Sequence, residues 1–483
     1  MRIKTHLFTI LSLLLATASI AQNNTSSPYS IRAYGELESF DNAFTRSLGG
    51  ATNGIRSPRC ISLGNPASLG SINMVLLDFG FRADGNKIYS ESAVKTKYNG
   101  NFNYFSLTFP MYRKSVIKKD TTVKNKTTKL YKEYRTIWAG SFGITPYSSI
   151  NAAYSKIKDT TYGQINNLYS NIGGLSRFYF MNSVNLTKNF SLGLNTSYIF
   201  GQSRSYSGFY VADSGVSRAT IDEKNTRMSG FKFDFGLQGQ IHDTITRLDS
   251  VMENGTMVLK KKRTPLRIVY GATLNNSAQL NYTVFRQILN KSNYYTVAGV
   301  DTVLLEENKK GKTSLPLGYS AGLSITYNNL WMLTADYRSD RWGEMKKGLY
   351  TDSFTNSSQF NIGLAYRPDA NVDMFKRREK NRRFKANLEY RVGFRSLNTG
   401  YNFKDNVGNI SPLKEYGISF GIGIPKTRMD YDQKQVVVKS MINITGEYIH
   451  RGNTSNGMIA EDMFRLTVGF TLADIWFVKR KYN

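Results

Sequence analysis

The stretch that decides the fold reads Phe231-Lys232-Phe233-Asp234-Phe235-Gly236-Leu237-Gln238, with apolar residues at every second position. The same pattern returns between Leu266 and Leu274, where the apolar residues include Ile268, Tyr270 and Ala272. A period of two places successive side chains on opposite faces of a strand, so each stretch predicts a strand with one apolar and one polar face. Many such segments of about ten residues, separated by turn residues, are typical of an outer-membrane β-barrel.

The first 21 residues have the composition of an export signal. Arg2 and Lys4 give a positive start, an apolar run follows from Leu7 to Leu15, and Ser19-Ile20-Ala21 forms a small-residue cleavage site. The apolar run is too short to span a bilayer as a helix, which predicts that residues 1–21 are removed. Gln22 follows the site where a lipidated protein would carry cysteine. Removal takes away two basic residues and no acidic ones, so the net charge of +29 falls to +27.

The composition is compatible with a barrel although the mean hydropathy is only −0.38. A barrel exposes apolar residues at every second position, so its average hydropathy stays low. The 31 Tyr, 28 Phe and four Trp residues suit aromatic girdles at the two membrane interfaces. A secreted array of β-sandwiches is the competing interpretation, but the sequence shows no repeated domain boundary. Cys60 is the only cysteine, so no intramolecular disulfide can form.

The chain divides into a signal peptide (1–21), an irregular segment (22–73) and a strand-rich region (74–483). The irregular segment is rich in Ser, Asn, Gly and Pro, and we interpret it as an N-terminal plug, or hatch, inside the lumen. Strands are predicted at 74–84, 100–113, 134–157, 174–186, 190–205, 228–242, 264–277, 315–327, 330–340, 357–367, 383–397, 413–425, 436–450 and 463–473. This count of about fourteen is even, as in bacterial single-chain barrels.

Pro146 lies inside the third predicted strand. Because proline has no N–H to donate to a neighbouring strand, it predicts a kink or a gap in the barrel wall, together with nearby Gly143 and Tyr147.

Loop lengths predict the topology, since periplasmic turns are short and outer loops are long. With the N-terminus inside, Thr187-Lys188-Asn189 and Asn328-Asn329 form periplasmic turns. The connection from Ala278 to Ser314 is the longest, and it falls outside. The connections near 114–133 and 243–263 are long for inner turns. A short C-terminal tail ends in the periplasm.

Basic residues concentrate on the predicted periplasmic side. A rim facing phospholipid headgroups explains them most simply. They also suit a docking face for an acidic periplasmic or envelope protein. Nucleic acid is excluded as a partner by the compartment. The residues that represent this basic rim are Lys118, Lys119, Lys261, Lys262, Arg377, Arg378, Arg382 and Arg383.

Several motifs resemble the FadL family of outer-membrane transporters for hydrophobic compounds, in particular a divergent branch of it. Leu48-Gly49-Gly50-Ala51 and Gly64-Asn65-Pro66-Ala67-Ser68 are similar to the family's N-terminal hatch, which carries an Asn-Pro-Ala motif before a fourteen-stranded barrel. Downstream similarities include Gly143–Ser148, Asp336-Tyr337 with Trp342, Glu389–Phe394, Gly417–Pro425 and the ending Trp476–Tyr482.

The resemblance covers nearly the whole mature chain and implies a mechanism as well as a fold. Family transporters pass fatty acids or aromatic hydrocarbons from a surface groove into the lumen, and the ligand leaves sideways through a gap at a kink in the third strand. Pro146 matches the position of that kink. Some family members do not transport, so membership alone leaves the function open.

The plug motif Asn65-Pro66-Ala67 has two interpretations. Asn before Pro favours a turn with extended backbone, and Ala leaves little bulk beneath the wall, so the motif suits a structural turn. It equally suits a hinge or latch that shifts when ligand arrives.

Enzymatic interpretations have little support. After signal removal only His242 and His450 remain, each at the end of a different predicted strand, so they do not form a shared site. No histidine or cysteine spacing suggests a metal, and no cofactor is expected.

The sequence therefore predicts an all-β protein: a transmembrane antiparallel barrel of about fourteen strands with an N-terminal plug, in contact with outer-membrane lipids. Its predicted function is passive, plug-gated uptake of a small hydrophobic compound, fatty-acid-like or aromatic, by lateral diffusion. The alternative is a non-transporting barrel subunit of an outer-membrane assembly for protein export or insertion.

Overall fold

The computed structural model describes residues 27–474 with several gaps. The gaps are residues 32, 92, 121–128, 161–162, 212–218, 254–255, 292–299, 345–348, 350–353, 369–387, 405–409, 431–434 and 456–457. The predicted signal peptide and four arginines of the predicted basic rim, Arg377, Arg378, Arg382 and Arg383, lie outside the described residues.

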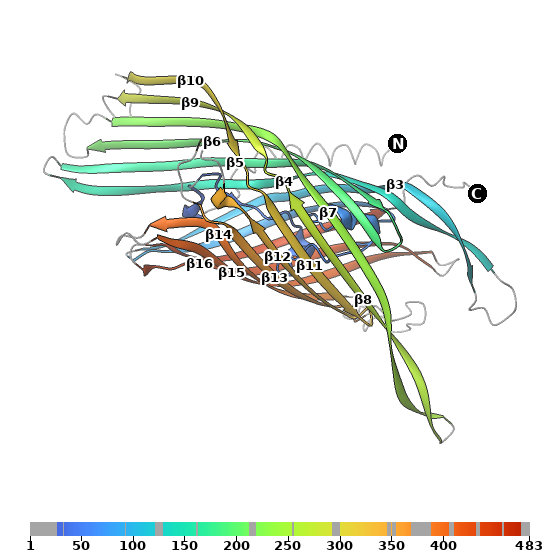
Figure 1. The fold of residues 1–483 in the computed structure, drawn as a ribbon. Coiled ribbons are helices and arrows are strands. Elements are labelled where there is room, and N and C mark those ends of the chain that lie inside the picture. Colours follow the sequence, from blue (N-terminus) through green and yellow to red (C-terminus); the bar gives the residue numbers. More distant parts are fainter. Residues whose placement is uncertain are drawn as a thin grey trace.

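Within the described chain, fourteen strands close into one antiparallel ring (Figure 1). Strand β8 pairs directly with β11, and β17 pairs with β2 to close the ring. All fourteen predicted segments overlap ring strands, so the predicted barrel is confirmed. The ring consists of β2 (Val75–Tyr89), β3 (Val94–Asp120), β4 (Lys129–Thr160), β5 (Gly163–Asn185), β6 (Phe190–Val211), β7 (Ala219–Glu253), β8 (Thr256–Asn275), β11 (Gly318–Tyr327), β12 (Trp331–Asp340), β13 (Ser357–Tyr366), β14 (Glu389–Lys404), β15 (Ile410–Asp430), β16 (Gln435–Gly452) and β17 (Ala460–Asp474).

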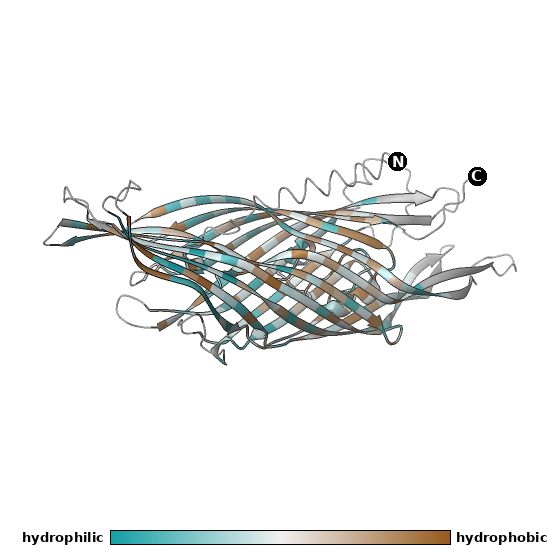
Figure 2. Cartoon of the chain, turned by 90° about the horizontal axis from the view of Figure 1, so that it is seen from above, coloured by the Kyte–Doolittle hydropathy of each residue, from teal (hydrophilic) through white to brown (hydrophobic). Residues whose placement is uncertain are grey.

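The alternation in the sequence becomes two faces of the wall. Phe231 and Phe235 are 57% and 52% exposed on the outer face, whereas Lys232 and Asp234 are 7% and 6% exposed on the inner face. Brown and teal residues alternate along the strands in Figure 2 for the same reason. Because hydrocarbon favours apolar side chains, the outer face suits lipid and the polar residues are retained in the lumen.

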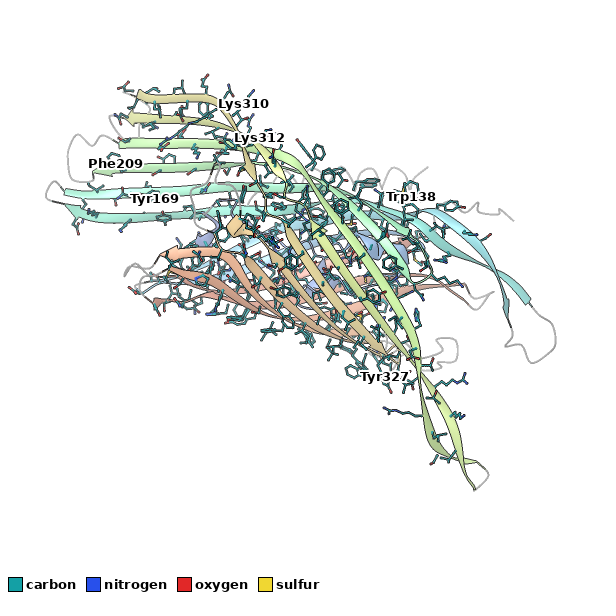
Figure 3. The ribbon with its side chains drawn as sticks, in the orientation of Figure 1. Trp138, Tyr169, Phe209, Lys310, Lys312 and Tyr327 are labelled. Carbon is teal, nitrogen blue, oxygen red and sulfur yellow. The ribbon has the colours of Figure 1, made fainter. Side chains whose placement is uncertain are left out.

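One end of the barrel carries the short turns, and we name it the turn end. Asn328 and Asn329 adopt positive φ there, as a tight turn requires. Trp138 and Tyr327 lie near this end (Figure 3), and the Trp331 and Tyr366 rings stack with centroids 4.3 Å apart. These aromatics occupy the position expected of an interfacial girdle. The opposite end is named the loop end.

Two connections predicted as long inner loops are paired strands instead. The β3–β4 ladder continues to the Asp120↔Lys129 pair, and the β7–β8 ladder continues to Glu253↔Thr256. Both hairpins extend past the barrel at the turn end, on the right of Figure 1. The prediction was wrong because continued pairing satisfies the backbone groups beyond the barrel, so the strands need not stop at its edge.

The longest predicted outer connection also contains strands. Strands β9 (Gln279–Lys291) and β10 (Val300–Ser314) form a hairpin at the loop end. Strand β9 pairs with residues 219–229 of β7, and so this hairpin widens the sheet without entering the ring.

The N-terminal segment, residues 27–73, lies within the ring and carries little regular structure. It contains η1 (Pro28–Ile31), β1 (Glu36–Leu37), α2 (Ala43–Arg46) and η2 (Pro66–Ser71), while η3 (Trp342–Glu344) follows β12. Asn42 caps α2 by accepting a hydrogen bond from the Thr45 N–H, which compensates for the shortness of this helix. Among the described residues, no helix is long and apolar enough to cross a membrane.

Each of the fourteen ring strands forms a hydrogen bond with this segment, and most of the described residues in the segment are buried. The bonding wall residues, in ring order, are Arg82, Tyr104, Tyr147, Ser183, Ser191, Leu237, Arg267, Ser324, Asp336, Asn361, Arg391, Ser419, Thr445 and Glu461.

Candidate functional site

The wall is interrupted between β3 and β4, close to Pro146. The β3–β4 ladder ends at the Phe105↔Ile144 pair, and the earlier part of β3 pairs only with β2. On its other side β4 stays paired with β5, with a register shift between Pro146 and Ser148. The predicted gap-forming residues Gly143, Pro146 and Tyr147 therefore lie at the point where the two strands separate.

The N-terminal segment covers the freed edge of β4. Strand β1 pairs with Ser148 and Ser149, and the Glu38 N–H donates to the Tyr147 carbonyl at 3.0 Å. Hydrocarbon cannot satisfy backbone polar groups, so an uncovered β4 edge would be costly at this depth. Movement of residues 36–38 would expose that edge.

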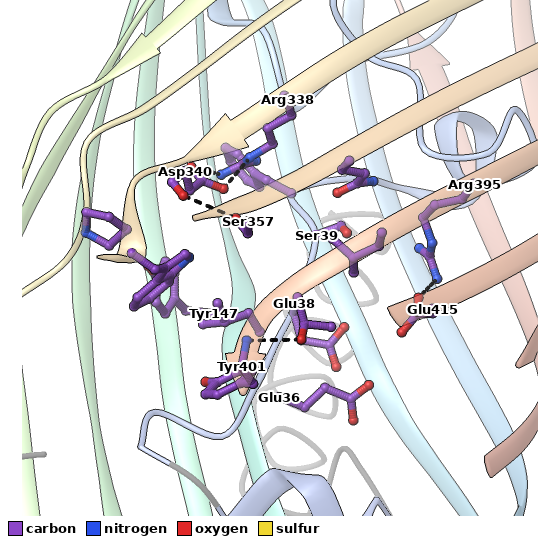
Figure 4. Close-up of a pocket in the computed structure, with 18 of the residues that line it drawn as sticks. Glu36, Glu38, Ser39, Tyr147, Arg338, Asp340, Ser357, Arg395, Tyr401 and Glu415 are labelled. Carbon is purple, nitrogen blue, oxygen red and sulfur yellow. Dashed lines mark hydrogen bonds and ion pairs between the residues drawn. The ribbon is translucent and has the colours of Figure 1, made fainter. Parts of the chain in front are cut away.

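A cavity of about 150 Å³ adjoins the interruption (Figure 4). Leu37, Glu38 and Tyr147 line it and also border the interruption. One flank is aromatic: Trp342 lies 5.9 Å from both the Tyr34 and the Phe354 ring, and the Tyr401 hydroxyl donates to the Gly35 carbonyl. This flank suits an apolar ligand.

The other flank is charged, and its charges are paired. Arg395 and Arg451 both contact Glu415, Arg338 contacts Asp340, and Lys232 contacts Asp234. Two further ion pairs join the wall to the segment: Arg82 with Glu38 at 2.8 Å and Arg451 with Glu36 at 2.6 Å.

The ion pair with Arg82 determines the pKa of the Glu38 carboxyl. Burial alone would raise the pKa of its carboxyl, but the Arg82 guanidinium outweighs burial and holds the pKa at about 2.

Arg177 is the exception on the charged flank. Its side chain is 6% exposed, and the guanidinium lies 4.2 Å from the Phe40 ring centroid and 4.9 Å from that of Tyr147. Among the described residues it has no ion-pair partner, and its Nε makes no hydrogen bond. The cavity thus combines an aromatic flank with one buried cation that lies over two rings and is attracted by Asp234 without forming an ion pair with it.

The plug motif packs against β6 and β7. Asn65 has extended backbone and its Oδ1 accepts from the Ala67 N–H, as expected for Asn before Pro. A Cβ added at Gly193 would lie 2.4 Å from the Pro66 carbonyl carbon, so the wall needs glycine there. The motif therefore forms a tightly packed turn, and its proposed action as a hinge stays a prediction.

The basic rim is only partly within the described residues. Lys118 and Lys119 belong to β3, and Lys261 and Lys262 belong to β8, so all four lie on the projecting hairpins. The side chain of Lys261 is exposed. The structure does not bring these four lysines to the cavity, because the hairpins extend from the turn end.

Sequence reasoning missed the charged wall residues of the cavity, including Arg177, Arg395 and Glu415. A signal existed, because charged residues occupy inward positions between apolar neighbours, as Arg395 does after Phe394. The two histidines lie apart as predicted: His242 pairs in register with Arg267, and His450 contacts Asp462 at 2.8 Å. The described residues contain no group of three or more His, Cys, Asp or Glu that could hold a metal ion.

Comparisons with known proteins agree with the fold. A family model described as BamG matches residues 2–119 and 135–483. No curated protein sequence matches the chain. Among solved structures, the P. putida toluene transporter TodX aligns with a TM-score of 0.51 and 13% identity, covering 91% of this chain and 100% of that chain.

Two further structures align over similar lengths. The Ralstonia pickettii toluene transporter TbuX gives a TM-score of 0.49 at 12% identity, covering 90% of this chain and 99% of that one. A Pseudomonas aeruginosa FadL homologue gives 0.49 at 11% identity, with 90% and 99% covered. The likeness to TodX shows a shared fold, and the molecule is an outer-membrane β-barrel of FadL-like architecture.

Proposed function

Because this chain belongs to the BamG family and has FadL-like architecture, we propose a function that this architecture permits: passive passage of a small hydrophobic compound across the outer membrane. The compound moves between the lumen cavity and the bilayer through the interrupted β3–β4 wall. The observation that carries the proposal is the end of the β3–β4 ladder at Ile144, directly beside the cavity.

The cavity chemistry supports an amphipathic ligand, either fatty-acid-like or aromatic with a polar end. The aromatic flank around Trp342 and Tyr401 accommodates the apolar body. Arg177 supplies a cation that is attracted by Asp234 but forms no ion pair among the described residues, and it can orient a polar or anionic end. The proposal includes no catalysed reaction.

We assign gating to residues 36–38 of the N-terminal segment, which cover the interruption between β3 and β4. Strand β1 holds the β4 edge through two register pairs, and residues 36–38 also line the cavity. Outward passage therefore requires β1 to separate from β4, with the Asn65-Pro66-Ala67 turn acting as the fixed point of the movement.

A disulfide lock tests this route. In a Cys60→Ser background, Glu36→Cys and Ser149→Cys place two thiols at register partners of β1 and β4. We expect oxidation to abolish uptake of a radiolabelled fatty acid or toluene into cells, and reduction to restore it. Ser339→Cys with Ser358→Cys, on the continuous β12–β13 ladder, is the matched control and should leave uptake unchanged. Equal uptake by the locked and reduced proteins would rule out this route.

A second function has its own supporting observation. The β3–β4 and β7–β8 hairpins project beyond the barrel at the turn end, and Arg247, Lys261 and Arg263 are exposed on one of them. Such hairpins suit a barrel subunit that docks an acidic envelope protein for protein export or insertion.

Pull-down in mild detergent, with mass spectrometry of proteins and lipids, separates the two functions. The docking function predicts a stoichiometric envelope protein that is lost when Lys261, Lys262, Arg377, Arg378, Arg382 and Arg383 are changed to Glu. The transport function predicts a barrel without such a partner, carrying a fatty acid or a detergent tail.

A further inference from the structure

A second cavity, of about 130 Å³, lies at the turn end of the lumen. Its wall is partly apolar, with Phe44, Met332 and Met441. Four arginines from three different parts of the chain also line it: Arg56 and Arg59 from the N-terminal segment, Arg267 from β8 and Arg367 just after β13. We name it the arginine cavity.

Glu389 attracts two of these arginines, Arg367 and Arg59, but in the described chain it forms no ion pair with either of them. Within the described ranges, none of the four forms an ion pair. Glu389 is the acidic residue among the lining side chains, and the Arg391 Nε already donates to it at 3.2 Å. The site therefore holds four formal positive charges against one carboxylate, and that carboxylate is already paired with Arg391.

The neutral contacts of these arginines leave donors unused. Arg56 is 6% exposed and donates to Ser191, Asn185 and Gln238, which are all uncharged. Arg267 donates to the Arg56 carbonyl. The buried Nε atoms of Arg267 and Arg367 make no hydrogen bond in the described structure.

Neighbouring arginines with unused donors destabilise the folded protein unless an anion binds among them. Burial, with Arg267 and Arg135 nearby, lowers the pKa of Arg56 to about 10. Desolvated like charges repel one another, and buried donors without acceptors lose their hydrogen bonds to water. A bound anion would remove both penalties at once.

We propose that the arginine cavity binds a phosphate group. A tetrahedral phosphate offers several acceptor oxygens and up to two negative charges, so guanidinium groups from different directions can donate to it together. A carboxylate offers two oxygens in one plane and satisfies fewer of them. The phosphate comes either from free inorganic phosphate or from the headgroup of a phospholipid at the turn end.

The test compares two double variants, each of which removes two positive charges. Arg59→Gln with Arg367→Gln removes two cavity charges, and neither side chain makes a hydrogen bond within the described structure, so folding should persist. Arg247→Gln with Arg263→Gln removes two exposed charges from the β7–β8 hairpin and is the matched control. Heat-modifiable gel migration checks that each purified full-length variant is folded.

The measurement is the thermal unfolding midpoint in detergent, titrated with inorganic phosphate at constant ionic strength with chloride as the balancing anion. We expect a saturable rise for the unmodified protein and the control. Binding by the cavity variant should be at least tenfold weaker.

A parallel titration with dihexanoyl phosphatidic acid, below its micelle concentration, identifies the source. Tighter binding of the lipid than of phosphate assigns the site to a headgroup, and equal binding assigns it to the free anion. The proposal is overturned if neither ligand gives a saturable rise, or if the cavity variant responds as the control does. The readouts are independent of uptake, so they stand whether or not the barrel transports.

Discussion

The two cavities lie at opposite ends of one N-terminal segment, and they differ in whether their arginines form ion pairs. At the loop end, Arg338, Arg395 and Arg451 each contact a carboxylate. At the turn end, Arg56, Arg59, Arg267 and Arg367 form no ion pair among the described residues. Paired charges hold a segment in place, because each partner compensates the desolvation of the other. Unpaired charges of one sign instead leave a positive potential that can attract a ligand.

Replacing the most heavily paired arginine should give the largest effect. Arg451 contacts Glu36, Glu415 and Glu461, so Arg451→Leu removes one shared cation from three carboxylates, of which Glu415 keeps Arg395. We expect the free energy of unfolding to fall by about 3–5 kcal/mol. Guanidinium unfolding of the barrel in lipid vesicles measures it. A change below about 1 kcal/mol would mean that the loop-end pairs do not stabilise the protein.

Close packing of the plug turn should give the next largest effect. A Cβ at Gly193 would meet Pro66 backbone at 2.4 Å, whereas a Cβ at Gly446 has no atom within 4 Å. Gly193→Ala should therefore cost about 1–3 kcal/mol, and Gly446→Ala should cost much less. Cys60, buried in the same segment, reports release of the turn: a thiol reagent should label it faster in Gly193→Ala only. Equal labelling of both variants would contradict the packing argument.

Acid should loosen the loop end before the turn end. The pKa of Glu38 is held at about 2 in the folded protein, against 4.5 ordinarily. Its contribution to stability is thus complete above pH 4.5 and is lost as the pH falls through 2. Between these values, hydrogen exchange of residues 36–38 should accelerate, while Arg56→Lys should leave this profile unchanged. A flat profile would contradict the pairing with Arg82.

The smallest effect is expected from Arg367→Leu at the turn end. Glu389 attracts the Arg367 guanidinium while Arg59 and Arg391 repel it, so these effects offset one another and the free energy of unfolding should change by less than about 1 kcal/mol. The same guanidinium titration measures it beside Arg451→Leu. If Arg367→Leu lowered the free energy of unfolding as much as Arg451→Leu does, the arginines of the two cavities would contribute to stability in the same way.

Local patterns predicted the wall well. Phe231 to Gln238 has the period of a strand, and each of the fourteen predicted segments overlaps a ring strand. The β3–β4 ladder ends at Ile144, close to Pro146, and the action of Pro146 in a lateral gate stays a prediction. The Asn65-Pro66-Ala67 turn was likewise predictable, since its Asn65–Ala67 bond is local.

The two cavities could not be predicted in the same way. Arg46 meets Glu447 across 401 positions, and Ser27 meets Glu461 across 434. No short-range pattern indicates which inward charges face each other around a ring. The projecting hairpins were missed for a related reason, because alternation alone does not mark where β3 and β7 leave the barrel.

The closing seam of the ring has a consequence for how the protein is made. Strand β2 begins the barrel and β17 ends it, and their register joins Val75 to Asp474. The ring cannot close until the last strand has been exported, so the longest chain loop must form at the end of folding. Ser27 and Arg46 bind Glu461 and Glu447 on the two final strands. Ser27 and Arg46 are consequently among the last residues to reach their native contacts, and until then the facing edges of β2 and β17 stay unpaired.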